Sequence, residues 1–238
     1  MARNQINMIP ISALIILLTF LLPQPSLAES PTVRSSLIRF MDALRGGGEL
    51  SAHPPPLLDW GWNATSDPCT AKWAGILCDQ EFRVVAVTLD GLELRGVLDA
   101  RTLCAATPLL AALSLRGNGH IHGPLPPEIA ECKSLTNLVI SGNRFEGAFP
   151  RSLGRMMMTG LREFRAQDNQ FSGPIPEVEG FGSLVGFDVS NNNLTGPIPG
   201  GLRTFSASAF AGNQGLCGPP LPGDCPFFPA PAPAPVLA

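Results

Sequence analysis

The chain repeats one pattern of apolar and polar positions along most of its length. The clearest copy is LVGFDVSNNNLTGPIP, at residues 184–199. Apolar and polar side chains alternate through Phe187, Asp188 and Val189, which predicts a short strand with one buried face. Asn192 then carries a side-chain amide that can satisfy backbone groups where the chain leaves the strand. One copy cannot bury its apolar side alone, so the pattern predicts copies stacked side by side.

The copies recur at a period typical of leucine-rich repeats, which predicts an α/β repeat solenoid. Residues 81–213 hold about five to six copies. The first copy is degenerate because Leu92 stands where an asparagine is expected, and the second has one extra residue before Ile121. The motif asparagines, separated by 25, 26, 23 and 21 residues, are Asn118, Asn143, Asn169, Asn192 and Asn213.

The two ends of the chain differ in composition from the repeats. Residues 1–28 begin with the positive Arg3, continue through the apolar run Ile9–Leu22 and end on small residues, which predicts a secretory signal peptide. The run is too short to cross a bilayer, and no later stretch is long and apolar enough to do so. Residues 227–238 are rich in proline and alanine and predict an extended spacer. We therefore expect a secreted or extracellular protein.

Residues 29–80 are expected to cap the first repeat, whose outer side has no neighbouring repeat. Ser30 and Pro31 favour the start of a helix, apolar residues follow at helical spacing, and the glycines at 46–48 favour its end. A loop separates this helix from aromatic and cysteine residues that suit a small covering structure. These are Trp60, Trp62, Cys69, Trp73 and Cys78.

Two close pairs of cysteines predict disulfides in an exported chain. Cys69 and Cys78 are nine residues apart in the amino-terminal cap. Cys217 and Cys225 are eight apart in residues 214–226, which we expect to close the last repeat as a second cap.

Cys104 and Cys132 are left over after the two caps are assigned. Cys132 lies where such repeats often carry a buried residue, so we expect free thiols in the core. A disulfide between the two is the alternative.

Three motifs give the chain a family resemblance. The pattern LxxLxLxxNxLxGxIP, the WxGIxC segment at residues 73–78 and the GNxGLCG segment at 212–218 resemble those of plant leucine-rich-repeat receptor ectodomains. Asp99 and the segment Phe205–Phe210 resemble pollen receptor-like kinases in particular. Such proteins continue into a membrane span and a cytoplasmic kinase, neither of which we expect in these 238 residues, so the resemblance implies no enzymatic activity here.

The resemblance implies a short arc with a parallel sheet on its concave side and ligand-binding side chains on that sheet. The alternative is that these polar side chains are only solvated. A further column on this face would hold Arg144 and Gln170. The candidate ligand-binding residues are Thr88, Asp90, Ser114, Arg116, Asn137, Val139, Ser141, Glu163, Arg165, Gln167, Asp188 and Ser190.

The implied function is extracellular recognition of a peptide or small protein, which includes another receptor ectodomain as a partner, without a kinase of its own. Arginines on the face could pair with carboxylates of the partner. Two alternatives stay open. The chain is a truncated record of a membrane-bound receptor-like kinase at the plasma membrane, or it is a secreted inhibitor of a wall-degrading enzyme.

The remaining chemistry is sparse. A net charge of −3 gives no electrostatic case for nucleic acid or an anionic membrane. His120 and His122 flank Ile121, but with no third ligand in view we expect neither a metal nor a cofactor. Asn63 and Asn193 open glycosylation sequons, of which we expect Asn63 to be modified more readily.

Overall fold

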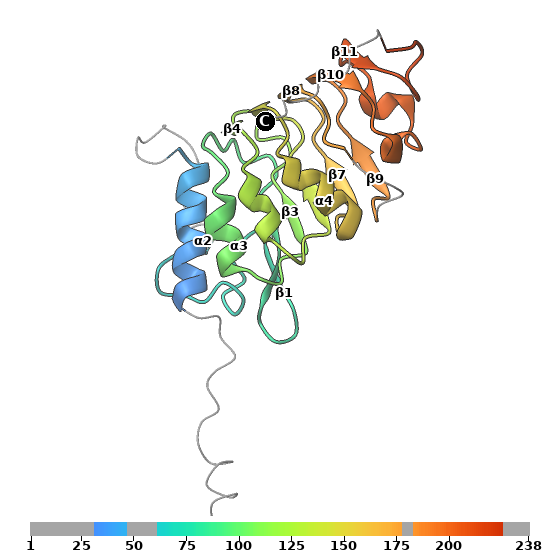
Figure 1. The fold of residues 1–238 in the computed structure, drawn as a ribbon. Helices are drawn as coiled ribbons and strands as arrows, with labels where there is room; N and C mark the ends of the chain where they lie inside the picture. Colours follow the sequence, from blue (N-terminus) through green and yellow to red (C-terminus); the bar gives the residue numbers. More distant parts are fainter. Residues whose placement is uncertain (1–30, 47–60, 178–182, 226–238) are drawn as a thin grey trace, which may run out of the picture.

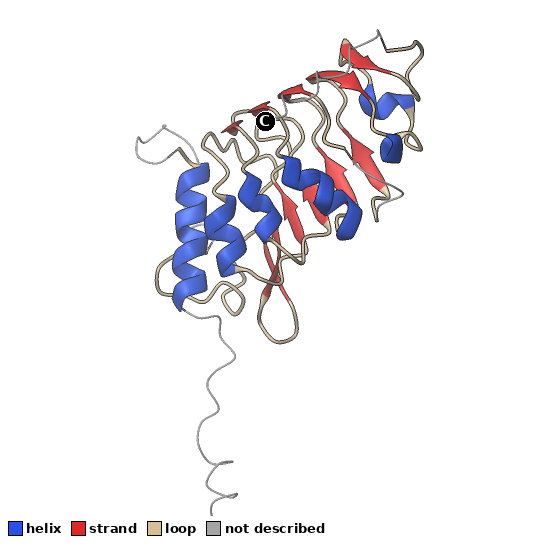
Figure 2. Cartoon of the chain, in the orientation of Figure 1, coloured by secondary structure: helices blue, strands red, loops and turns tan. Residues whose placement is uncertain are grey.

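The structure is a computed structural model that describes residues 31–46, 61–177 and 183–225. The predicted signal peptide, Trp60 and the proline- and alanine-rich tail lie outside these residues. The described chain forms an arc of stacked repeats, with strands along one side and helices along the opposite flank (Figure 1 and Figure 2). The predicted repeat solenoid is therefore confirmed.

The larger sheet has six strands in the order β1-β2-β3-β5-β7-β9. Strand β1 is antiparallel to β2, and every later pair is parallel and in register from one repeat to the next. The strands are β1 (Ile76–Cys78), β2 (Val84–Thr88), β3 (Ala112–Ser114), β5 (Asn137–Val139), β7 (Glu163–Arg165) and β9 (Gly186–Asp188).

A second sheet, which the sequence pattern did not predict, has five parallel strands in the order β11-β10-β8-β6-β4. It forms where each repeat turns away from the larger sheet. Its strands are β4 (His122–Gly123), β6 (Arg144–Gly147), β8 (Gln170–Gly173), β10 (Asn193–Pro197) and β11 (Gly215–Cys217).

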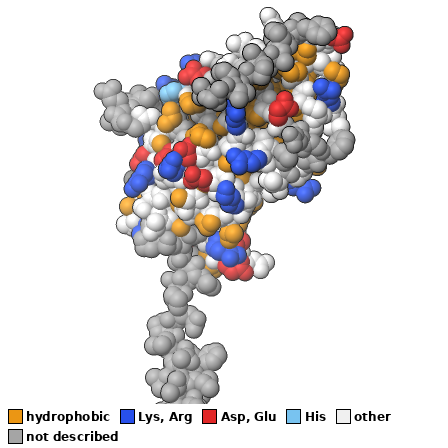
Figure 3. All heavy atoms as spheres, in the orientation of Figure 1, with side chains coloured by type: hydrophobic (Ala, Val, Ile, Leu, Met, Phe, Trp, Pro, Cys, Tyr) orange, Lys and Arg blue, Asp and Glu red, His pale blue; other side chains and the backbone are white. Residues whose placement is uncertain are grey.

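Helices cover the flank opposite the larger sheet, and Figure 3 shows this helix-bearing face. The predicted cap helix is α2, and a glycine of the first repeat lets its end dock closely. A Cβ on Gly96 would overlap the carbonyl of Ala43, while the Gly96 N–H donates to Leu44 O at 2.7 Å. The helices are α2 (Pro31–Leu44), α3 (Ala100–Ala106), η2 (Pro127–Glu131), α4 (Arg151–Thr159), η3 (Gly200–Leu202) and η4 (Ala207–Phe210).

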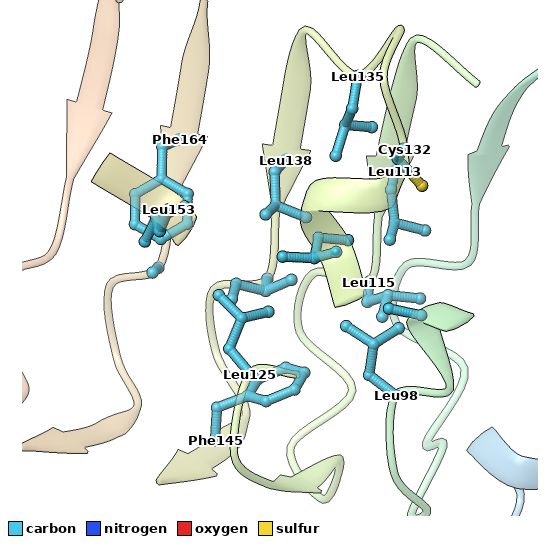
Figure 4. Close-up of a cluster of buried hydrophobic side chains, with 14 of the residues drawn as sticks. Leu98, Leu113, Leu115, Leu125, Cys132, Leu135, Leu138, Phe145, Leu153 and Phe164 are labelled. Atoms are coloured by element: carbon cyan, nitrogen blue, oxygen red, sulfur yellow. The ribbon is translucent and has the colours of Figure 1, made fainter. Parts of the chain in front are cut away.

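The core lies between the larger sheet and the helices, where each strand contributes one inward residue. Leu113, Leu138 and Phe164 stand in register on β3, β5 and β7 and are at most 1% exposed (Figure 4). Phe187 continues this column, with a ring-centroid distance of 6.0 Å to Phe164 and 5.5 Å to Phe210. Each repeat therefore buries its strand against its neighbours, as a solenoid requires.

The motif asparagines form a ladder of buried hydrogen bonds. The Asn169 Nδ2 donates to Ile140 O in the preceding repeat and to Ala166 O in its own, and its Oδ1 accepts from the Phe145 N–H at 3.0 Å. Asn143 makes the donor contacts, but its buried Oδ1 has no partner. In the later repeats this oxygen accepts the N–H of Phe145, Phe171 or Leu194 in the preceding copy. The copy that precedes Asn143 is the one with the extra residue before Ile121, the equivalent position.

Both predicted cap disulfides are present. Cys69 and Cys78 are joined with a Cα–Cα distance of 5.8 Å, and Cys217 and Cys225 with one of 5.0 Å. In the amino-terminal cap, Trp62 and Trp73 are buried with ring centroids 5.1 Å apart. The outer sides of the first and last repeats are covered as the sequence pattern indicated.

The expectation of free thiols at Cys104 and Cys132 is wrong, because the two residues form a disulfide with a Cα–Cα distance of 4.6 Å. Cys104 lies in α3 and Cys132 directly follows η2. These helices pack side by side on successive repeats, so both cysteines face the same buried seam. The bond thus joins two repeats on the helical flank.

None of the helices placed in the structure is long and apolar enough to span a bilayer. Among the described residues, no group of three or more His, Cys, Asp and Glu residues could hold a metal ion.

Candidate ligand-binding face

The solvent side of the larger sheet brings the predicted columns together. Thr88, Ser114, Val139, Arg165 and Asp188 are aligned by the strand register, one residue per repeat. At about 4.8 Å per strand, the six strands cover about 24 Å. We call this surface the sheet face.

A second predicted column lies just beyond the strands and is aligned by backbone hydrogen bonds between repeats. The N–H groups of three glycines donate to carbonyls of this column in the next repeat, at 2.8–2.9 Å. The pairs are Gly91 with Arg116, Gly117 with Ser141 and Gly142 with Gln167. The Asp90 carboxylate accepts from the Ser114 hydroxyl at 2.6 Å and from the Arg116 N–H at 2.8 Å. This carboxylate therefore joins the two columns at the amino-terminal end of the face.

A hollow of about 370 Å³ occupies the centre of the sheet face. Thr88, Asn137, Asp188 and Ser190 were also predicted but do not line it. Arg144 and Gln170 lie on β6 and β8 of the second sheet, so the expectation that they form a column of this face is wrong. The residues lining the hollow are Asp90, Ser114, Arg116, Val139, Ser141, Glu163, Arg165 and Gln167, all of them predicted.

An ion-paired network holds one wall of the hollow. Arg165 Nε donates to Glu163 Oε1 at 3.1 Å, and Asn137 Nδ2 donates to Glu163 Oε2 at 2.9 Å. The Glu163 and Arg165 side chains are 35% and 37% exposed, so solvent screens the pair and its contribution to stability is small. The network fixes where these two charges stand on the face.

Gly186 is a residue of this face that the sequence pattern missed. It pairs with Glu163 on the neighbouring strand, and a Cβ there would lie 3.3 Å from Glu163 Cγ and 3.4 Å from Arg165 Nη2. The missing side chain leaves room for the ion pair to lie over β9. Gly186 follows Asn137 and Glu163 in one column of the sheet. A glycine after these larger residues is the sequence feature that could have identified it.

One charged group in the hollow is free to meet a partner. Arg116 is exposed, and within the described part of the chain its guanidinium has no ion pair. The Gln167 side-chain oxygen has no hydrogen-bond partner either, but it is buried and so is not presented to a ligand. The hollow therefore offers a cationic donor, which suits a polypeptide carrying a carboxylate.

The two sequons differ in geometry. Asn63 Nδ2 donates to Gly61 O and to the Ser66 hydroxyl, both at 2.8 Å, while its Oδ1 accepts from the Thr65 N–H. Asn193 is exposed on β10, at the rim of a hollow of about 520 Å³ beside the second sheet. The expectation that Asn63 is modified more readily stays a prediction, and the geometry of the folded chain favours Asn193.

Family models match three segments of the chain. The leucine-rich repeat N-terminal domain matches residues 34–79, and the leucine-rich repeat matches residues 134–156 and 183–205. Pollen receptor-like kinase 1 from Arabidopsis thaliana is 33% identical over 241 residues, covering 92% of this chain and 33% of that protein. The chain spans about a third of the length of the pollen receptor-like kinases that it matches.

Solved structures of plant receptor ectodomains are also similar. The BIR3–SERK2 complex from Arabidopsis thaliana includes a chain matched with a TM-score of 0.66 and 28% identity, over 80% of this chain and 97% of that one. The Arabidopsis receptor kinase HAESA, solved with the peptide hormone IDA and the co-receptor SERK1, matches with a TM-score of 0.60 and 30% identity. That match covers 72% of this chain and 27% of the other.

Proposed function

Because the chain is a leucine-rich-repeat ectodomain of the plant receptor-like kinase type, we propose that its sheet face binds an extracellular peptide or protein partner. The observation that carries the proposal is the central hollow, which gathers aligned polar residues from successive repeats. Of the described lining residues only Ser141 is buried, and none belongs to the hydrophobic core. Their role is recognition rather than catalysis.

The partner that fits this face is an extended polypeptide. About eight residues of extended chain span the same 24–29 Å as the six strands. The free Arg116 guanidinium suits a carboxylate of the partner. HAESA, a structural relative, was solved with a peptide hormone and a co-receptor, which supports the same class of partner here.

The location and the wider role follow from the same proposal. Residues 1–28 direct export, and the sheet face then works outside the cell. Signalling through a kinase would come from a separate polypeptide or from a longer form of this one, as in the receptor-like kinases that the chain resembles.

The test is a double charge reversal of Arg116→Glu and Arg165→Glu. Peptides of about eight residues selected on the wild-type protein from a random library serve as ligands. We expect the double variant to bind them at least tenfold more weakly, because each lost charge-assisted hydrogen bond is worth roughly 1.5–3 kcal/mol.

The matched control is the pair Arg144→Glu and Arg151→Glu, which makes the same change of charge away from the sheet face. Thermal melting checks that both double variants are folded. If the folded face variant keeps the wild-type affinity, or if the control loses as much, the selected peptides bind elsewhere and the proposal fails.

A further inference from the structure

On the helical flank, charged side chains gather along two seams, one between α3 and η2 and the other between η2 and α4. On the α3 side of η2, Arg101 Nη2 lies 2.6 Å from Glu128 Oε1. This hydrogen bond raises the pKa of Arg101 above its usual value, and Glu131 adds an attraction from the same side. Glu128 is thus ion-paired with α3, and Glu131 is close enough to attract the same guanidinium.

Among the described residues, the charged side chains that line the seam between η2 and α4 are positive. Lys133 and Arg155 are exposed there, and in the described ranges neither forms an ion pair. In Figure 3, red and blue side chains lie close together over α3 and η2, and further blue side chains lie apart from them toward α4. Unpaired cations on one seam leave a local positive potential.

A hollow of about 290 Å³ lies in this cationic seam, and we call it the flank hollow. It lies between η2, a 3₁₀ helix of five residues, and α4, an α-helix of nine. At about 2.0 and 1.5 Å per residue, α4 is longer than η2 by about 3–4 Å. Its last turn lines the hollow together with the chain that follows η2.

The floor of the flank hollow is apolar and its rim is basic. Leu135, Met156, Leu161 and the Cys132 sulfur line it, each at most 9% exposed. Lys133 and Arg155 also line it, and none of its described lining residues carries a carboxylate. The Cys104–Cys132 disulfide ties the wall that follows η2 to α3, so the hollow is largely formed in advance.

We propose that the flank hollow binds a small organic carboxylate with an apolar ring or short chain. Its volume is close to the lower limit of small-molecule sites. The apolar part of such a ligand covers the buried floor, and its carboxylate pairs with Arg155 and Lys133. This site lies on the helical flank, away from the sheet face, and does not depend on the function proposed for that face.

The probe is 2-naphthoate, titrated into the isotope-labelled protein and followed by NMR. We expect saturable shifts of the residues lining the flank hollow, with a Kd on the order of 1 mM for a ligand of this size. The neutral 2-naphthamide, which keeps the rings but lacks the charge, should bind at least tenfold more weakly.

Single charge reversals locate the site. Arg155→Glu and Lys133→Glu should each weaken 2-naphthoate binding about tenfold, as expected for the loss of one charge-assisted contact. Arg151→Glu is the matched control, because Arg151 lies one helical turn before Arg155, is exposed and does not line the hollow. It should change the Kd by less than about twofold.

Three results would overturn the proposal. They are no saturable shift of the lining residues up to about 10 mM 2-naphthoate, equal binding of 2-naphthamide, and a loss in Arg151→Glu as large as in Arg155→Glu. Circular dichroism confirms folding of each variant, and Lys133→Glu provides a second test if Arg155→Glu does not fold.

Discussion

Asn143 and Asn169 occupy the same position in successive repeats, but their side chains are not equally satisfied. Asn169 uses both ends of its amide, whereas the Asn143 Oδ1 is buried without a partner. A buried polar group without a hydrogen bond costs about 1–3 kcal/mol. The sequence pattern predicts both asparagines as structural, yet only the geometry distinguishes them.

We expect Asn169→Ala to destabilise the protein by about 3 kcal/mol, because it leaves the buried Phe145 N–H without its partner and removes one of the two hydrogen bonds that the Ile140 carbonyl accepts. Asn143→Ala should cost about 1 kcal/mol less, since it also removes the unpaired oxygen. Chemical denaturation measures both. Equal losses would mean that the Asn143 oxygen is satisfied in solution.

The sequons give a second prediction for single residues. Asn193→Gln should remove most of the glycosidase-sensitive mobility shift of the secreted protein, because Asn193 is exposed while the Asn63 amide is already engaged by Gly61 and Ser66. Asn63→Gln is the comparison. A larger loss of the shift in Asn63→Gln would show that modification precedes the folding of the cap loop.

The helices and strands that could be predicted are those whose apolar residues recur at a regular spacing within one segment. Helix α2 follows from apolar residues at helical spacing, and the columns of the sheet face follow from the repeat period, which fixes the register. The second sheet could not be predicted, since its strands are two to five residues long and contain the glycines of the motif. Short strands of this composition resemble turns.

The flank hollow and the Cys104–Cys132 bond depend on how neighbouring repeats meet. Neither the relative lengths of η2 and α4 nor the position of α3 beside η2 is visible in the spacing of one segment. The repeat pattern predicts that Cys132 is buried. Its disulfide with Cys104 forms only because the helices of two successive repeats pack together and bring cysteines 28 residues apart into contact.

Replacing both Cys104 and Cys132 with alanine should lower the free energy of unfolding by about 3–4 kcal/mol. The bond closes a loop of 28 residues, whose entropy in the unfolded chain supplies an effect of this size. Denaturation of the double variant against wild type measures it. A change below about 1 kcal/mol would mean that the packing of α3 on η2 holds this seam without the bond.

At the scale of the whole molecule, stability is distributed along one dimension, because each repeat contacts only its neighbours. The amino-terminal part is joined by two disulfides and the helix contacts of α2, α3 and η2. The carboxyl-terminal part is joined by the aromatic column of Phe164, Phe187 and Phe210 and by the second cap. The sheet face runs over both parts.

The extra residue before Ile121 lies where these two parts meet, at the step from the second repeat to the third. Asn143 keeps its donor contacts but lacks the acceptor contact that the other motif asparagines make, so this step is the weakest of the asparagine ladder. Local opening follows the weakest contacts. Amide protons of residues 119–123 should therefore exchange with deuterium faster than those of 144–147 and 170–173, and equal protection would contradict this. The arc then behaves as two cooperative units with a joint between them, and a ligand that spans the sheet face would slow exchange at that joint.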